Sequence, residues 1–124
     1  MTADSAKSRP LILLQTAPYD GSLARSSLDL ALSFAVFAQQ PQLLFCGAGV
    51  LCLSAHQHPD AIGRKSLRKV IDSLPMYDLE TIFVDAGSLE MNGLNSAHLP
   101  GFAVVLDARQ VRLLIGGASH VISL

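Results

Sequence analysis

Five short apolar runs constrain the fold of this chain more than any other feature of its sequence. The runs are Leu11–Leu14, Leu43–Cys46, Thr81–Val84, Phe102–Leu106 and Val121–Ile122. Continuous apolar runs of this length are typical of strands buried on both faces of a parallel sheet. Segments with helical patterning separate them, which predicts parallel crossover units. The expected fold is α/β: a single three-layer domain with a five-stranded, mostly parallel sheet and helices on both faces.

Three of the connecting segments are expected to be helical. A helix is predicted over residues 23–38, which contain neither Gly nor Pro, and a second over residues 60–74, ended by Pro75. A short third helix is predicted to be capped by Asp107 and to stop at Gly116–Gly117. Two other stretches are expected to be mostly irregular. Gly47–Gly49 is predicted to form a turn, and residues 85–95 a loop that contains one helical turn.

Length and charge exclude several classes of protein. The 124 residues suit one domain, and a formal net charge of -1 demands neither a nucleic-acid nor a membrane ligand. No apolar run is long enough for a membrane span or a signal-peptide core, which favours a soluble, cytoplasmic protein. The polar residues 1–10 are expected to be a flexible N-terminal tail, followed by one domain over residues 11–124.

The predicted helix over residues 23–38 carries more apolar surface than one sheet face requires. A helix that covers a sheet needs a single apolar stripe. Leu30, Phe34 and Phe37 extend the apolar surface beyond that stripe, and half of all residues in the chain are hydrophobic. These three side chains are therefore predicted to contact another protein chain.

Cys46 and Cys52 are too few for a disulfide scaffold, which favours a reducing compartment. Cys46 lies at the carboxyl end of the second predicted strand, where open α/β sheets bind ligands. A thiol there is nucleophilic, or carries a persulfide, if its pKa is lowered. The alternative is a buried cysteine that packs as a small hydrophobe, as Cys52 is also expected to do. Cys46 is thus the one candidate catalytic residue, and both interpretations stay open.

No metal or cofactor site is predicted. His56 and His58 lie near the two cysteines, but their spacing matches no standard ligand pattern. Gly47–Gly49 follows a strand, but Cys52 occupies the position of the third glycine in a dinucleotide-binding turn. Asp107 is better explained as a helix cap, and Asp20 and Asp85 as loop residues, than as metal ligands.

A basic stripe lies on the second predicted helix, because residues four apart share a helix face. It consists of Arg64, Lys65, Arg68 and Lys69. Such a stripe is either a solvated helix face or a site for RNA phosphate or an acidic partner. No aromatic residues interleave with it, which favours the solvated face.

Several short motifs occur in an order and at a spacing that point to a known family. They are Thr16–Pro18, Arg25 with Leu28–Asp29, Tyr77–Glu80, Ser88–Leu89 and Gly93–Leu94. On these motifs, residues 11–124 resemble the TusC/DsrF branch of the DsrE-like proteins. The resemblance implies a five-stranded parallel sheet between helices. It also implies assembly with TusB-like and TusD-like subunits into a hexamer of paired heterotrimers, as in TusBCD and DsrEFH complexes.

Such complexes relay persulfide sulfur, through a downstream acceptor protein, toward 2-thiolation of the wobble uridine in tRNA, so that tRNA is only an indirect partner. DsrF-like chains belong to similar complexes for sulfur oxidation. In both, the resemblance assigns the sulfur carrier to a cysteine of the TusD/DsrE-like subunit, after the third strand. The matching segment here, Ile82–Leu89, contains no cysteine.

The resemblance therefore implies a non-catalytic, accessory subunit of a sulfurtransferase complex. Three alternatives stay open: a DsrF-like subunit for sulfur oxidation, a sulfurtransferase that uses Cys46, and a binding module that uses the strand-end loops or the basic stripe. Whether the chain by itself is an enzyme is not decided by its sequence.

Overall fold

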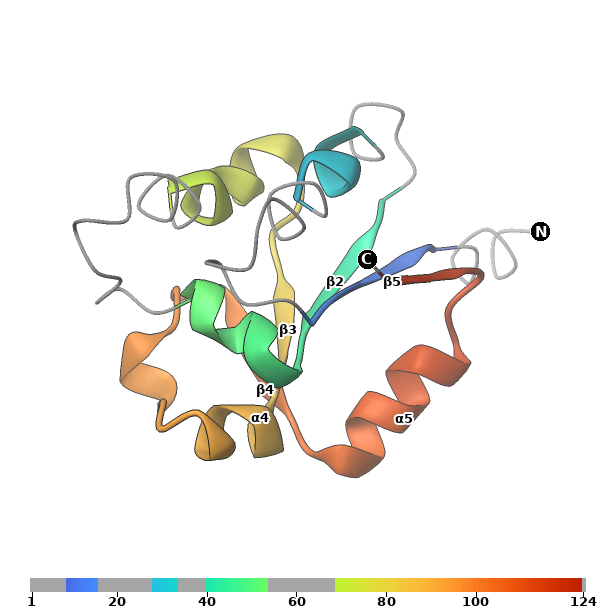
Figure 1. Ribbon diagram of the computed structural model, residues 1–124. Coiled ribbons are helices and arrows are strands. Elements are labelled where there is room, and N and C mark those ends of the chain that lie inside the picture. Colours follow the sequence, from blue (N-terminus) through green and yellow to red (C-terminus); the bar gives the residue numbers. More distant parts are fainter. Residues whose placement is uncertain (1–8, 16–27, 34–39, 54–68, 124) are drawn as a thin grey trace.

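The computed structural model describes residues 9–15, 28–33, 40–53 and 69–123. Within them, five strands form one sheet (Figure 1). The strands are β1 (Leu11–Leu14), β2 (Gln42–Phe45), β3 (Ile82–Asp85), β4 (Ala103–Leu106) and β5 (Val121–Ser123). Each lies within a residue or two of an apolar run in the sequence. The predicted five-stranded α/β fold is confirmed.

The sheet has the order β4-β3-β2-β1-β5, and every neighbouring pair is parallel. From β1 to β4 the chain adds each strand on the same side. It then crosses back to place β5 beside β1. Right-handed crossovers in these two directions lie on opposite faces of the sheet. This order leaves β4 and β5 as the two edge strands.

One face of the sheet carries the core. Two register rows point toward it: Ile12, Leu43 and Ile82, then Leu14, Phe45 and Val84, all at most 1% exposed. They pack with side chains from the helical residues 28–33 and 69–73, namely Leu28, Ala31 and Ile71. These helical segments lie together at the top of Figure 1. Full burial of each large side chain contributes roughly 1.5–3 kcal/mol, so this layer holds the domain together.

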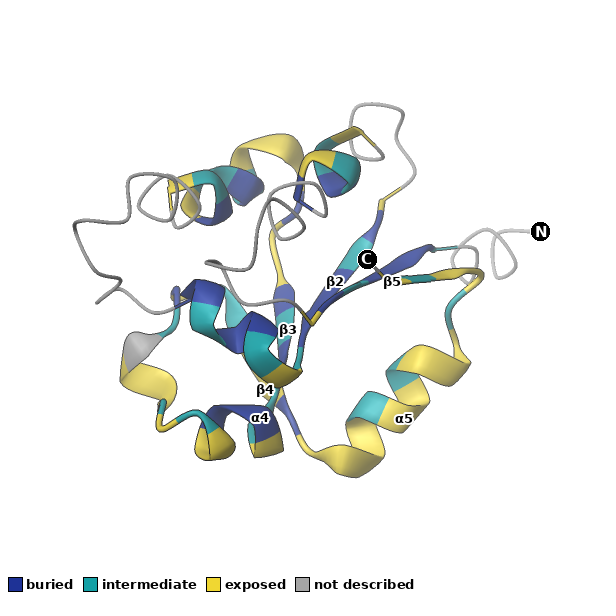
Figure 2. Ribbon diagram, viewed as in Figure 1, coloured by how far each residue is buried: buried dark blue, intermediate teal, exposed yellow. Residues whose placement is uncertain are grey.

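The opposite face is covered by α5 (Ala108–Gly116), which stands apart from the other helices in Figure 1. The helix begins as predicted: Asp107 and Gln110 form a reciprocal capping box. However, α5 contains no buried residue, and Figure 2 shows it largely exposed. The three-layer arrangement is therefore thick on one face and thin on the other.

The second predicted helix ends before Pro75, within a residue of the predicted position. The α-helical residues 69–73 pass into a 3₁₀ helix, η2 (Leu74–Tyr77), with Pro75 in its first turn. Proline is tolerated there because the first turn of a helix does not use its N–H groups. The 3₁₀ helix ends at Asp78, whose φ of 68° is left-handed, and Asp78 and Leu79 donate their N–H groups back to η2.

The glycine-rich turn after β2 is also more regular than predicted. Residues 47–53 form a 3₁₀ helix, η1 (Gly47–Leu53). Gly47 has a φ of +55°, which is easiest for glycine. At Gly49 an added Cβ would lie 1.8 Å from the Leu14 carbonyl oxygen. Glycine at this position therefore lets η1 approach the end of β1.

The predicted loop over residues 85–95 contains a true helix, α4 (Ala86–Met91), and a short 3₁₀ turn, η3 (Ser96–His98), follows it. The prediction that Asp85 is a loop residue is wrong. Asp85 ends β3 and caps α4, because its side chain accepts the Ser88 N–H. None of the helices in the described segments is long and apolar enough to cross a membrane.

Candidate functional site

The carboxyl ends of β2 and β3 meet at one edge of the sheet, where η1 and α4 both begin (Figure 1). Cys46 follows β2 directly and stays attached to β1, because its N–H donates to the Leu14 carbonyl at 3.1 Å. The register of β2 with β3 places Cys46 beside Asp85. Parallel α/β sheets bind their ligands at this edge. It is therefore the candidate site.

Ser88 is the centre of the hydrogen bonding at this edge. Its hydroxyl donates to Asp85 Oδ2 at 2.6 Å and accepts the Gly47 N–H at 2.7 Å. Its own N–H donates to the same Asp85 oxygen at 3.1 Å. Ser88 is only 8% exposed. One buried hydroxyl therefore joins β3, α4 and η1, and both of its hydrogen-bonding functions are used inside the protein.

Asn92, just after α4, adds a second connection. Its side-chain amide donates to the Ser88 carbonyl at 2.8 Å and to the Gly47 carbonyl at 3.3 Å. Gly47 thus donates to Ser88 and accepts from Asn92. Because backbone groups of η1 are held from both ends of α4, the two helices form one hydrogen-bonded unit at the sheet edge.

The two cysteines have thiols that resist ionisation. Burial raises the pKa of the half-buried Cys46 above its usual 9.0, and the nearby Asp85 carboxylate raises it further. Cys52 lies in η1 and packs in the core, and burial raises the pKa of its thiol to about 12. The thiolate is the nucleophile and the persulfide carrier, so both shifts oppose the reactive form of these cysteines. Cys46 lies at the end of the sheet where parallel α/β folds bind ligands, but burial and the Asp85 carboxylate oppose its thiolate form.

Ser88 and Asn92 were not among the candidate residues from sequence. Asp85-Ala86-Gly87-Ser88 did carry a signal, since an aspartate at a strand end followed by small residues is typical of a helix N-terminus. The link from Ser88 to Gly47 carried none. It joins residues 41 positions apart, and only the pairing of β2 with β3 brings them together.

Most other candidates lie outside the described residues: Phe34, Phe37, the two histidines His56 and His58, Asp20, and the stripe residues Arg64, Lys65 and Arg68. Leu30 is half-buried and packs against the core cluster, and Lys69 is exposed. Asp107 caps α5, as predicted. Within the described residues no three His, Cys, Asp or Glu side chains gather as metal ligands would.

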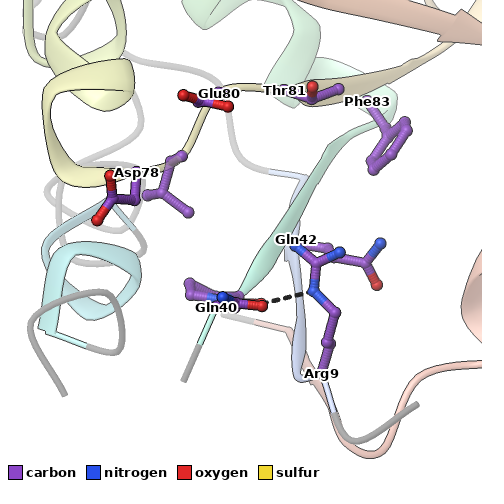
Figure 3. Close-up of a pocket in the computed structure, with 9 residues that line it drawn as sticks. Arg9, Gln40, Gln42, Asp78, Glu80, Thr81 and Phe83 are labelled. Carbon is purple, nitrogen blue, oxygen red and sulfur yellow. Dashed lines mark hydrogen bonds between the residues drawn. The ribbon is translucent and has the colours of Figure 1, made fainter. Parts of the chain in front are cut away.

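A cavity of about 330 Å³ opens at the opposite, amino edge of the sheet (Figure 3). Arg9 lies at one side, and its Nε donates to the Gln40 carbonyl at 2.9 Å. Asp78, Glu80 and Phe83 line other parts. Among the described residues, no cysteine or histidine lines the cavity. It is therefore a polar surface hollow without a sulfur nucleophile, remote from Cys46 and Ser88.

Comparisons with known proteins agree on one family. A family model described as the DsrE/DsrF-like family matches residues 9–123. A TusC homologue of Pseudomonas aeruginosa is 33% identical over 92% of this chain and 96% of its own length. Another, of Vibrio parahaemolyticus, is 29% identical over 90% of this chain and 94% of its own.

Among solved structures, the ychN protein of E. coli has the same fold. It superposes with a TM-score of 0.76 over 94% of this chain and 99% of its own, at 14% sequence identity. At that identity the likeness concerns the fold alone.

Proposed function

This chain belongs to the DsrE/DsrF-like family, and on that premise we propose that it is a non-catalytic, structural subunit of a sulfur-relay complex. Its proposed role is to position and cover a neighbouring subunit whose cysteine carries the sulfur. The family and the TusC homologues support a sulfur-relay subunit. The silent role of this chain is inferred from the chemistry of the carboxyl edge.

The observation that carries the proposal is the hydrogen bonding of Ser88. In the segment where the resemblance assigns the carrier cysteine, Ile82–Leu89, the chain has no thiol. The hydroxyl present there donates to Asp85 and accepts from Gly47, so it is committed to structure. A persulfide forms when a thiolate attacks a sulfane sulfur, and a hydroxyl held in this way cannot replace it.

The nearest thiol, Cys46, does not supply the missing chemistry. It lies beside Asp85, whose negative charge opposes a second negative charge on the sulfur. Catalytic cysteines are typically activated by nearby cations or helix N-termini, which lower the pKa. The opposite shift at Cys46 disfavours the alternative in which this chain is itself the sulfurtransferase.

The proposed partners are TusB-like and TusD-like subunits, in a hexamer of paired heterotrimers. The proposed pathway leads through a downstream acceptor protein to 2-thiolation of tRNA in the cytoplasm, with tRNA only indirectly involved. A DsrF-like role in sulfur oxidation uses the same fold and the same kinds of partner. Leu30, Phe34 and Phe37 remain proposed interface residues. Of these, Leu30 packs against the core, so its contribution to an interface is limited to its exposed part.

The test is a pull-down of the tagged chain from its native lysate, with intact-mass analysis of every co-eluting protein. Two small partners are expected, one of which carries an added sulfur atom while this chain does not. A Cys46→Ser variant is the matched control and should leave the sulfur on the partner unchanged. If this chain elutes alone, or if it carries the sulfur and loses it in the variant, the proposal is wrong.

A further inference from the structure

The β4 edge of the sheet is an exposed apolar strand. Val104 is 43% exposed and Val105 is 39% exposed. Successive residues of a strand point to opposite faces, so β4 shows apolar surface on both faces of the sheet edge. Proteins usually protect such edges with charges, proline or a bulge. β4 has the sequence Ala-Val-Val-Leu and contains neither a charge nor a proline.

The backbone of β4 also offers hydrogen-bonding groups on its outer side. The Ile82 N–H donates to the Phe102 carbonyl, and Ile82 is in register with Ala103. In a parallel ladder, the backbone N–H and C=O groups of every second residue bond to one neighbouring strand. The backbone groups of Val104 therefore point toward β3, whereas those of Ala103 and Val105 point away from the sheet. Ala103 donates its N–H to the Pro100 carbonyl. The Ala103 carbonyl and both backbone groups of Val105 are then available to another strand.

The helix that follows β4 carries exposed apolar and positively charged side chains. α5 contacts β4, and its Leu113 is 66% exposed. Arg109 and Arg112 are exposed on the same helix, and between β4 and the end of β5 the only Asp or Glu is the helix cap, Asp107. The chain as a whole has a net charge of -1, so this positive segment stands out.

We propose that β4 and α5 form the docking surface for a partner subunit of the sulfur-relay complex, which adds an extended apolar segment to the β4 edge and places carboxylates beside Arg109 and Arg112. This inference rests on the proposed function, because it concerns the same complex. The free backbone groups require an extended partner, as in other cases of strand addition. The two arginines favour an acidic one by charge complementarity.

A second copy of this chain fits the surface less well. In a two-fold symmetric contact the same patch meets itself. Self-association through β4 and α5 would bring together two surfaces that each carry Arg109 and Arg112, whereas an acidic partner removes that repulsion. The other edge strand, β5, is a weaker candidate since it has three residues and one large exposed hydrophobic side chain, Val121.

The test compares Val105→Lys with Val121→Lys in the tagged chain, co-expressed with its native partners. The two valines are 39% and 44% exposed and lie on opposite edges, so they are matched in burial. Val105→Lys is expected to reduce the co-eluting partner by about tenfold or more, because an unpaired charge would be buried in the contact. Val121→Lys is expected to leave it unchanged. Thermal unfolding of both variants shows whether they fold.

Hydrogen exchange on the unmutated complex gives a readout that needs no variant. The Val105 amide is expected to exchange at least about tenfold more slowly in the complex than in the isolated chain, since it becomes hydrogen-bonded. An Arg109→Glu/Arg112→Glu double variant should also lose the partner, and increasingly so at low salt.

The outcomes separate the two proposals. If the wild-type chain co-elutes with no partner, the proposed function fails. If it assembles normally but Val105 exchanges at the same rate in both states, or Val105→Lys keeps its partner, the docking surface is wrong while the proposed function stands. Light scattering that shows a dimer of the isolated chain, lost in Val105→Lys, would replace the acidic partner with a second copy.

Discussion

Removing the Ser88 hydroxyl should destabilise the protein more than its size suggests. Ser88→Ala deletes one hydrogen bond to the Asp85 carboxylate, at 2.6 Å, and one from the Gly47 amide, at 2.7 Å. A bond to a charged acceptor contributes roughly 1.5–3 kcal/mol and a neutral one about 1 kcal/mol, and the remaining groups are partly buried. The backbone N–H of residue 88 still donates to Asp85 in the variant, so the carboxylate is not left without a hydrogen-bond donor.

The expected loss of unfolding free energy is therefore about 2–3 kcal/mol, or a fall in Tm of roughly 6–12 °C for a domain of this size. Urea denaturation followed by circular dichroism measures it. Ser73→Ala is the matched control, because the Ser73 hydroxyl makes one part-buried bond, to the Val70 carbonyl at 2.6 Å. It should cost under about 1 kcal/mol.

A double-mutant cycle with Asp85→Asn measures how much of the lost unfolding free energy comes from the bond between Ser88 and Asp85. Ser88 and Asp85 are in direct contact, so the two substitutions should be non-additive by about 1 kcal/mol or more. If Ser88→Ala costs no more than Ser73→Ala, or if the cycle shows no coupling, the view of Ser88 as the link between β3, α4 and η1 is refuted.

Three further predictions concern the cysteines and one glycine. Cys46 should react slowly with iodoacetamide near neutral pH because the pKa of its thiol is raised. Asp85→Asn should speed the reaction, since it removes one cause of that shift. Fast alkylation of the wild type at pH 7 would contradict this prediction. The pKa of Cys52 in the folded protein is about 12, above its ordinary 9.0. The contribution of the neutral Cys52 thiol to the unfolding free energy is therefore complete below pH 9 and is lost as pH rises toward 12. Urea titrations should show this decline in the wild type and a weaker decline in Cys52→Ala. Gly49→Ala should destabilise by about 3 kcal/mol or more, measured by thermal unfolding, because its Cβ would overlap the Leu14 carbonyl.

The strands were predictable because their signal is local. Each apolar run marks one strand, and burial of the central strands β1 and β2 leaves few alternatives for them. The Asp107 cap was also predictable, since Asp107 and Gln110 are three residues apart. The end of the α-helix before Pro75 was predictable as well. The 3₁₀ helix η2 that follows was not, because local sequence does not show whether a proline only ends one helix or also stands in the first turn of a new one.

The sequence by itself determined the five strands and showed which chemistry is missing, because the segment Ile82–Leu89 contains no thiol. Only the tertiary structure decided what stands in place of that thiol. It brings Gly47 to Ser88 across 41 positions, sets the negative charge of Asp85 beside Cys46, and leaves Val105 on a free sheet edge. The physical reason is that apolar periodicity specifies burial along the chain, whereas strand order, and with it every contact between distant residues, arises only when the strands pair.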